Sequence, residues 1–266
     1  MIRLLFVGDV MGGPGRRAVQ AHLEGLVDRE RVDFVVANVE NAAGGFGITA
    51  AVLEELDHLP IDVLTTGNHV WDKKEGVPLL DAHPTLLRPA NYPEGNPGRG
   101  WCVEETAAGV PVAVINLQGQ AMMPPIDNPF RCADRVLAEI AAAHPELKVV
   151  LVDMHAEATS EKQAMGWYLD GRVTAVLGTH THVPTADERV LPGGTAFLTD
   201  AGMTGPYEGV IGFKSDRVLQ RFLLQTPSSF EVAKRDVRLA AAVVDVDETT
   251  GRARGIQRLL VPDREE

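Results

Sequence analysis

The sequence predicts an α/β fold, because short apolar runs alternate with helix-like segments along most of the chain. The opening unit shows the pattern, with an apolar run at 2–7, a glycine-rich loop, and a helix that begins near Arg16. Five such runs are followed directly by side chains that commonly bind metals. In an open α/β sheet, sites form outside the carboxyl ends of the strands. We therefore expect these five strand ends to direct their polar side chains into one crevice.

The length and composition are those of a globular protein, and we expect one domain over residues 1–266. Apolar residues make up 45% of the chain and charged residues 23%, and no apolar run approaches the roughly 20 residues that a membrane span needs. We expect no membrane partner. The amino-terminal residues lack the features of a signal peptide, so a cytoplasmic location is the expectation.

The charge and cysteine content exclude several classes of function. A formal net charge of −12 argues against a stable complex with nucleic acid, although a small anionic substrate is still compatible with it. Cys102 and Cys132 lie far apart and form no CxxC pattern, so neither a disulfide framework nor a thiolate zinc site is predicted. We expect both thiols to be inert, either packed or at the surface.

The first two strand ends supply carboxylates and an amide. Asp9 follows the run at 2–7, where a helix cap or a turn residue would be about as plausible as a ligand if it stood alone. The surrounding glycines match neither common nucleotide-binding template. Glu40 and Asn41 follow the run at 34–37, where an unpaired charge would be costly without a cation. We therefore interpret Glu40 as a metal ligand, and expect Thr49 to cap the following helix.

The third strand end, after residues 61–66, carries Asn68 and His69, a neutral oxygen ligand beside a titratable imidazole. Two irregular stretches follow, at about 85–109 and at 118–130, both rich in proline or glycine. We expect them to form the rim or lid of the site, and the sequence does not define their roles further.

The last two strand ends supply imidazoles. His155 follows a run at 149–152, which is preceded by a predicted helix at about 133–143. His180 and His182 leave a run at 173–177 two residues apart, so that their rings can face the same side. Thr159 or Ser160 is the expected cap of the helix between these runs. A strand at 196–199 and antiparallel strands at 230–233 and 239–246 are expected to complete the chain.

The remaining polar residues do not suggest another site. Single histidines are more often surface or capping residues than ligands, which is our interpretation of four of them: His22, His58, His83 and His144. A serine nucleophile elbow is not present in the sequence. Oxygen and imidazole ligands without thiolates suit manganese, iron or zinc in a catalytic site. Two such ions could clamp both oxygens of a phosphoryl displacement, with Glu40 as the candidate bridge.

These motifs resemble a known family. Gly8-Asp9, Gly67-Asn68-His69, His155 and the stretch from Gly178 to His182 are similar, in order, to the motifs of the calcineurin-like metallophosphoesterases. In that superfamily a ligand histidine follows the first aspartate by two residues, where this chain has Met11, and an aspartate usually stands where this chain has Glu40 followed by Asn41. Both departures resemble the bacterial YmdB-like branch. The likeness extends from Gly8 to about Gly212.

The resemblance implies a four-layer α/β/β/α sandwich with mixed sheets and two divalent metal ions, either iron or manganese, with zinc as a further option. It implies one metal held by Asp9, Glu40, Asn41 and His182, and the other by Glu40, Asn68, His155 and His180. Two divalent ions and two carboxylates leave a local charge of about +2, which suits a phosphate substrate.

The implied activity is that of a phosphodiesterase, with small 2′,3′-cyclic nucleotides as the expected substrates and a metal-bridging hydroxide as the nucleophile. His69 would act as a general acid toward the leaving alkoxide. A phosphomonoesterase or nuclease could use the same ligands, and a non-catalytic nucleotide- or RNA-responsive regulator could retain them. The sequence also leaves homo-oligomerisation open.

Overall fold

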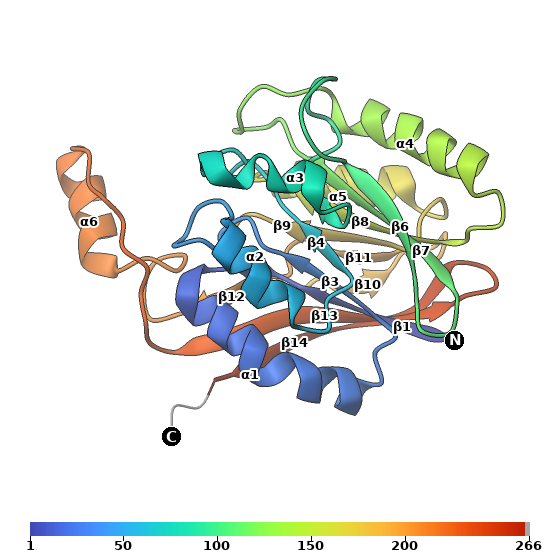
Figure 1. Cartoon of the computed structure of the whole chain (residues 1–266), viewed down its shortest axis with the longest axis horizontal. Helices are drawn as coiled ribbons and strands as arrows, with labels where there is room; N and C mark the ends of the chain where they lie inside the picture. Colours follow the sequence, from blue (N-terminus) through green and yellow to red (C-terminus); the bar gives the residue numbers. More distant parts are fainter. Residues whose placement is uncertain (264–266) are drawn as a thin grey trace.

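The strand predicted at 2–7 lies in the middle of the first of two β-sheets (Figure 1). This sheet has the order β2-β12-β13-β1-β3-β4-β5, with β14 paired to β13. Its strands are β1 (Ile2–Val7), β2 (Asp9–Val10), β3 (Phe34–Asn38), β4 (Val63–Thr65), β5 (Leu86–Leu87), β12 (Met203–Pro206), β13 (Val237–Asp247) and β14 (Arg252–Pro262). The strands β1, β3, β4 and β5 are parallel, whereas β13 pairs with β1 in the antiparallel direction. The computed structural model describes residues 1–263.

The second sheet is formed by the middle of the chain, in the order β10-β11-β9-β8-β7-β6. Its strands are β6 (Trp101–Glu105), β7 (Pro111–Gln118), β8 (Val149–His155), β9 (Ala175–Thr179), β10 (Arg189–Val190) and β11 (Ala196–Leu198). The four central strands are parallel, and the two edge strands β6 and β10 are antiparallel to their neighbours. The stretch at 85–109 thus contains two strands, β5 and β6, and is less irregular than its composition predicts.

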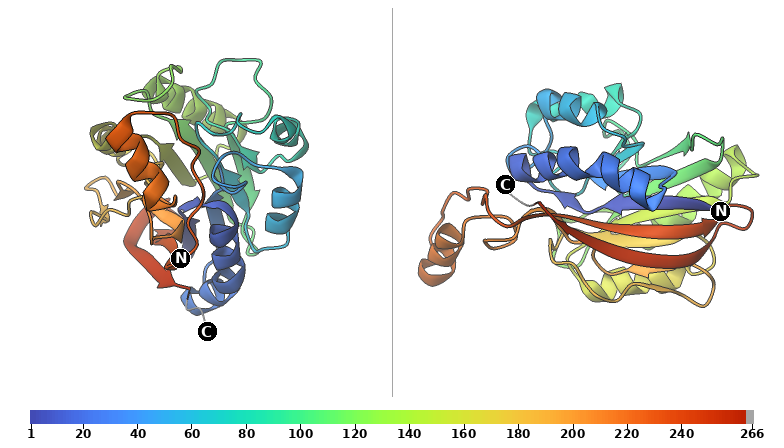
Figure 2. Two further views of the ribbon diagram at one scale, coloured as in Figure 1. Left: turned by 90° about the vertical axis from the view of Figure 1, so that its left-hand side faces the viewer. Right: turned by 90° about the horizontal axis from the view of Figure 1, so that it is seen from below.

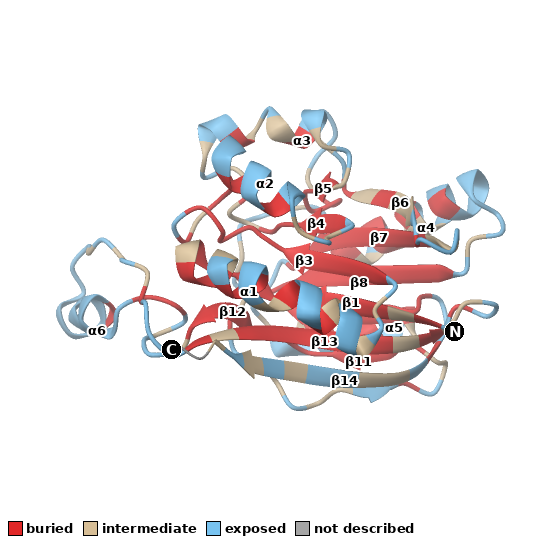
Figure 3. Cartoon of the chain, turned by 60° about the horizontal axis from the view of Figure 1, so that its bottom comes forward, coloured by how far each residue is buried: buried red, intermediate tan, exposed pale blue. Residues whose placement is uncertain are grey.

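Three apolar layers hold the two sheets and their helices together. Leu4 and Phe6 of β1 face Leu151 of β8 across the space between the sheets, while their neighbour Leu5 packs on the other face against Leu23 of the first helix. Alternate residues of a strand point to opposite faces, so β1, which is apolar apart from Arg3, is buried on both sides over most of its length (Figure 3). The predicted four-layer α/β/β/α sandwich is confirmed.

Helices cover the outer face of each sheet (Figures 1 and 2). The helices of residues 1–263 are α1 (Gly12–Glu30), α2 (Ala50–Asp57), α3 (Leu79–Ala82), α4 (Pro129–Ala143), α5 (Thr159–Leu169), α6 (Ser215–Leu224) and a 3-10 turn, η1 (Lys74–Gly76). The predicted cap is confirmed at α2, where the Thr49 hydroxyl oxygen accepts from the Val52 N–H at 3.3 Å. It is wrong at α5, where Ala158 precedes the helix without a side-chain cap, and where Thr159 and Ser160 lie inside it.

The helices also begin earlier than their apolar periodicity indicates. The first helix begins at Gly12 and not near Arg16. The fourth begins at Pro129 and not near Ala133, because the Asn128 side chain accepts from the N–H groups of Phe130 and Arg131 at 3.0 and 3.1 Å. At α4 the polar cap and the proline lie outside the apolar pattern, so the pattern alone places the start of this helix too late.

The segment 207–236 differs most from the sequence prediction. It contains the helix α6, which projects from the sandwich (Figures 1 and 2). Residues 230–233 were predicted to form a strand, but Val232 makes only an isolated bridge to Phe213. Val218 is the one buried residue of α6. No helix among residues 1–263 combines the length and apolar character that crossing a bilayer requires.

Candidate metal centre

The predicted site residues lie at the carboxyl ends of strands from both sheets. The first sheet supplies carboxylate and amide groups, which are Asp9 after β1, Glu40 and Asn41 after β3, and Asn68 after β4. The second sheet supplies imidazoles, which are His155 at the end of β8, and His180 and His182 after β9. The structure brings all seven side chains together, and it places His69 at their edge.

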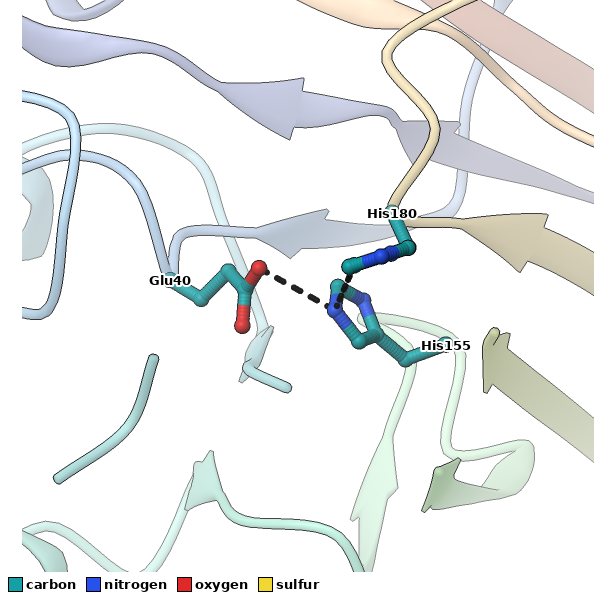
Figure 4. Close-up of side chains that lie close together, drawn as sticks. All are labelled: Glu40, His155 and His180. Carbon is teal, nitrogen blue, oxygen red and sulfur yellow. Dashed lines mark hydrogen bonds and ion pairs between the residues drawn. The ribbon is translucent and has the colours of Figure 1, made fainter. Parts of the chain in front are cut away.

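The first group of contacts surrounds Nε2 of His155 (Figure 4). This nitrogen lies 3.0 Å from Glu40 Oε1, 3.1 Å from Asn68 Oδ1 and 3.1 Å from His180 Nδ1. One imidazole nitrogen carries at most one hydrogen, so hydrogen bonding alone does not account for three close partners. The ligand atoms of Glu40, His155 and His180 all lie within 4.8 Å of one another.

These separations are those expected between ligands of one cation. Bonds of about 2.0–2.2 Å to a divalent metal place neighbouring ligand atoms about 3.0–3.4 Å apart. Imidazole nitrogen and carboxylate and amide oxygen form a donor set that suits iron, manganese or zinc. The residues present therefore fit a divalent transition metal at this position.

A second group of contacts lies beside the first and shares Glu40 with it. The Asn41 amide nitrogen lies 3.0 Å from His182 Nε2, 3.3 Å from Glu40 Oε1 and 3.5 Å from Asp9 Oδ1. His182 Nε2 is 3.9 Å from the same Asp9 oxygen. Half a turn of the Asn41 amide would direct its oxygen into the group. Glu40 Oε1 thus lies within 3.3 Å of donor atoms in both groups.

Each of the three imidazoles presents one nitrogen to the site and has the other nitrogen bound by an oxygen. His155 Nδ1 lies 2.9 Å from the Thr179 hydroxyl, which itself donates to Asp153 at 2.6 Å. His180 Nε2 lies 3.1 Å from Glu157 Oε2, and His182 Nδ1 lies 2.9 Å from the Ile211 carbonyl. An acceptor on the outer nitrogen fixes the tautomer that leaves the inner nitrogen free, which is the usual arrangement around a bound metal.

The partner behind His155 is a residue that the sequence reasoning missed. Asp153 is fully buried, and it accepts hydrogen bonds from Thr179, Thr65 and Asn38. The available signal was an aspartate inside an otherwise apolar strand, two residues before His155 and so on the same face. Because β8 and β9 are parallel with His155 opposite Thr179, the strand register creates this relay.

Burial and the neighbouring charges shift the pKa values of the site residues. Burial raises the pKa of Asp9 to about 6, although His182 and His155 counteract it. Burial would also raise the pKa of Glu40, but the charge and hydrogen bond of His155 outweigh it and hold the value at about 2. Burial opposes protonation of His155, yet Glu40 raises its pKa to about 9. Burial, followed by the charge of His155, lowers the pKa of His180 to about 3.

The backbone near the site adopts conformations that side chains rarely tolerate. His180 and His182 have φ angles of 98° and 65°, which cost about 1–3 kcal/mol each where the surrounding structure imposes them. Gly67 meets a different constraint, because a Cβ atom there would overlap the ring of His155. Such strain at the loop that carries two histidines is typical of functional sites.

His69 lies at the rim of the centre and is held from two sides. Its backbone N–H donates to Glu40 Oε2 at 3.0 Å, and its Nδ1 lies 2.8 Å from Asp72 Oδ2. Its ring packs edge-on to Phe46 with ring centroids 4.9 Å apart, and 27% of the side chain is exposed. The sequence reasoning missed Asp72, although a carboxylate three residues after a candidate catalytic histidine is a recognisable signal.

The other histidines occupy the positions predicted for them. His58, His83 and His144 stand at the carboxyl ends of α2, α3 and α4. His22 lies on α1, with Nε2 2.9 Å from Asp263. Both cysteine thiols are free and buried, in agreement with the packing role considered for them.

Comparison with known proteins identifies the family of this chain. The family model described as "YmdB-like protein" matches residues 5–259. A 2′,3′-cyclic-nucleotide 2′-phosphodiesterase of Bacillus subtilis (strain 168) is 47% identical over 262 residues, which is 98% of each chain.

Two solved structures share the fold. A hypothetical protein of Thermus thermophilus superimposes with a TM-score of 0.91 at 42% identity, covering 99% of this chain and 100% of its own. A structure described as a novel phosphatase of Mycoplasma pneumoniae has a TM-score of 0.91 at 32% identity, covering 98% of this chain and 93% of its own. The chain therefore belongs to the YmdB-like family, a branch of the calcineurin-like metallophosphoesterases.

Proposed function

We propose that this protein is a dinuclear metal-dependent phosphodiesterase that hydrolyses 2′,3′-cyclic nucleotides. The observation that carries the proposal is the pair of donor groups joined by Glu40, in which three imidazoles each have their outer nitrogen bound by an oxygen. A cluster with only a structural role would not require three imidazoles that each direct a free nitrogen toward the same centre.

The contacts support the ligand assignment that the family resemblance implies. One metal would be held by Asp9, Asn41 and His182, and the other by Asn68, His155 and His180, with Glu40 contributing to both. Iron and manganese suit this set best, and zinc would also fit. When bound, two such ions supply positive charge for a phosphate and lower the pKa of bound water.

The name of the Bacillus relative supports a 2′,3′-cyclic nucleotide as the substrate. Such a substrate is small and singly charged, which is compatible with a protein of net charge −12. Hydrolysis would add the hydroxyl of water to phosphorus and its second hydrogen to the 2′ oxygen, giving a nucleoside 3′-phosphate. His69 is our candidate donor of that proton, and Asp72 would orient its ring.

The test is an assay of the metal-replete protein on matched substrates. We expect it to open 2′,3′-cyclic AMP to 3′-AMP and to cleave bis-p-nitrophenyl phosphate, with both rates lost in Glu40→Ala. The control is Glu139→Ala, which removes an exposed carboxylate on α4.

The products distinguish the competing activities. Release of adenosine from 3′-AMP would indicate a phosphomonoesterase, and shortening of an RNA oligonucleotide would indicate a nuclease. If the metal-loaded protein binds the cyclic nucleotide and turns over none of these substrates, the catalytic proposal is wrong and a regulatory role is favoured.

A further inference from the structure

A buried ion pair lies behind the loop that carries His180 and His182. Lys162 of α5 and Asp200, which follows β11, are both fully buried, and Lys162 Nζ lies 2.6 Å from Asp200 Oδ2. A pair of this kind adds little net stability, because the cost of removing two charges from water offsets their attraction. Its presence therefore calls for another explanation.

The remaining contacts of Asp200 supply that explanation. Its Oδ2 atom also accepts from the backbone N–H of Thr181 at 3.2 Å and from the Thr181 hydroxyl at 2.7 Å. Its Oδ1 atom accepts from the N–H of Gly202 at 2.8 Å. Hydrogen bonds to an ionised carboxylate are stronger than neutral ones. Asp200 thus fixes the residue that stands between the two histidines, and Lys162 balances its buried charge.

This loop requires contacts that stabilise its conformation, because both histidines that flank Thr181 have positive φ angles. It is held by at least four contacts, one of which is the contact of His180 Nε2 with Glu157 Oε2 described above. The His180 N–H donates to Asp9 Oδ2 at 3.1 Å, Thr181 binds Asp200, and His182 Nδ1 lies 2.9 Å from the carbonyl of Ile211 in the projecting segment. Among these contacts, the one between Thr181 and Asp200 acts on the residue that links the two histidines.

We propose that Lys162 and Asp200 are positioning residues, which act through Thr181 to hold the imidazoles of His180 and His182 in their metal-binding orientation. The inference rests on the metal site of the proposed function. Because His180 and His182 are assigned to different ions, loss of this support should weaken both metal positions. Loss of His182 itself should primarily weaken one.

The experiment compares Thr181→Val with Thr181→Ser. Valine removes the hydroxyl bond to Asp200 and leaves the ion pair intact, whereas serine retains the hydroxyl. Metal content would be measured across a series of buffered free Mn²⁺ concentrations, and the thermal midpoint would be measured on the metal-free proteins. We expect Thr181→Val to lower the affinity of both positions about tenfold, and Thr181→Ser to stay near wild type.

Asp200→Asn extends the test, because it removes the charge that binds Thr181. We expect it to lower both affinities by up to about 100-fold. Its matched control is Asp170→Asn, since Asp170 similarly accepts from the N–H groups of Gly193 and Thr195, in another loop. We expect the control to lower the thermal midpoint of the metal-free protein without a change in metal affinity. If Asp200→Asn does not fold, Thr181→Val still decides the question.

Wild-type affinity at both positions in Thr181→Val would overturn the inference. So would an affinity loss in Asp200→Asn no larger than that in Asp170→Asn. Since the readout is metal affinity, failure of this inference can be distinguished from failure of the proposed function. A wild-type protein that binds two Mn²⁺ ions and cleaves no diester would contradict the proposed activity and leave this test valid.

Discussion

At the scale of single residues, the orientation of three imidazoles determines what the site can bind. His155, His180 and His182 each direct one nitrogen inward because the other is engaged by an oxygen. Two groups of donors then meet at Glu40. His69 lies at the edge of these groups with its ring held by Asp72, and we propose it as the proton donor.

Replacing His69 by alanine should keep both metals bound and lower turnover of a 2′,3′-cyclic nucleotide about 10²- to 10⁴-fold, the usual contribution of a positioned proton donor. The ribose alkoxide is a poor leaving group and needs that proton. Hydrolysis of bis-p-nitrophenyl phosphate should fall less, because p-nitrophenolate leaves readily. The measurement is the two rates, with metal content and thermal midpoint, on this one variant.

Equal losses on the two substrates with metals intact would count against His69 as the general acid. A ligand role would instead appear as lost metal. A purely structural role, through the contact with Phe46, would appear as a lower thermal midpoint with both rates affected alike.

Glu40→Ala should lower metal occupancy at both positions, because Glu40 Oε1 lies within 3.3 Å of donors in each group. His182→Ala should primarily affect one position, since its contacts are with Asn41 and Asp9 alone among the proposed ligands. Elemental analysis of both purified variants checks this. Full retention of two metals in Glu40→Ala would remove it as the bridge.

At the scale of elements, the strands that carry the ligands were predictable and the groups behind those ligands were not. Each ligand directly follows an apolar run, which is a local signal. The relay from His155 to Thr179 and Asp153 depends on the register of β8 against β9, which the local signal at Asp153 does not give. The contact of Ile211 with His182 likewise depends on the path of a distant loop.

The helix α6 was missed for a different reason. Its apolar residues Val218, Leu219 and Phe222 recur at helical spacing, but the beta-rich pattern around them favoured strands. Most of its apolar side chains do not enter the core, with Phe222 76% and Leu223 79% exposed. Phe213, which lies two residues before α6, is buried in a cluster with Met11 and Met203.

This contrast gives a prediction for stability. Phe213→Ala should lower the free energy of unfolding by about 3–5 kcal/mol, because it removes a buried aromatic ring. Phe222→Ala should change it by less than about 0.5 kcal/mol, since that ring is largely exposed. Denaturant unfolding of both variants measures the difference. A similar loss in Phe222→Ala would mean that α6 packs against the protein in solution.

At the scale of the whole molecule, the site connects the two sheets. The first sheet supplies the carboxylates and amides, and the second supplies the imidazoles. Met11, which stands where the wider superfamily has a ligand histidine, is fully buried in the apolar cluster with Met203 and Phe213. We propose that residues 1–266 form one domain in which each metal position takes ligands from both sheets.

Thermal unfolding should therefore occur in one transition, and metal binding should raise its midpoint. A ligand present at about 100 times its dissociation constant adds about 2.7 kcal/mol to the stability of the folded state. Calorimetry with and without a chelator measures both effects. Two separate transitions, with only one sensitive to metal, would contradict the single-domain proposal.

The central claim is a phosphodiesterase that requires two metal ions, and a metal titration tests it most directly. Metal-free protein would receive increasing equivalents of Mn²⁺, and the rate of conversion of 2′,3′-cyclic AMP to 3′-AMP would be followed at each step. We predict that activity rises until about two equivalents are bound per chain and then stays constant. Saturation at one equivalent, or no hydrolysis with two ions bound, would contradict the account.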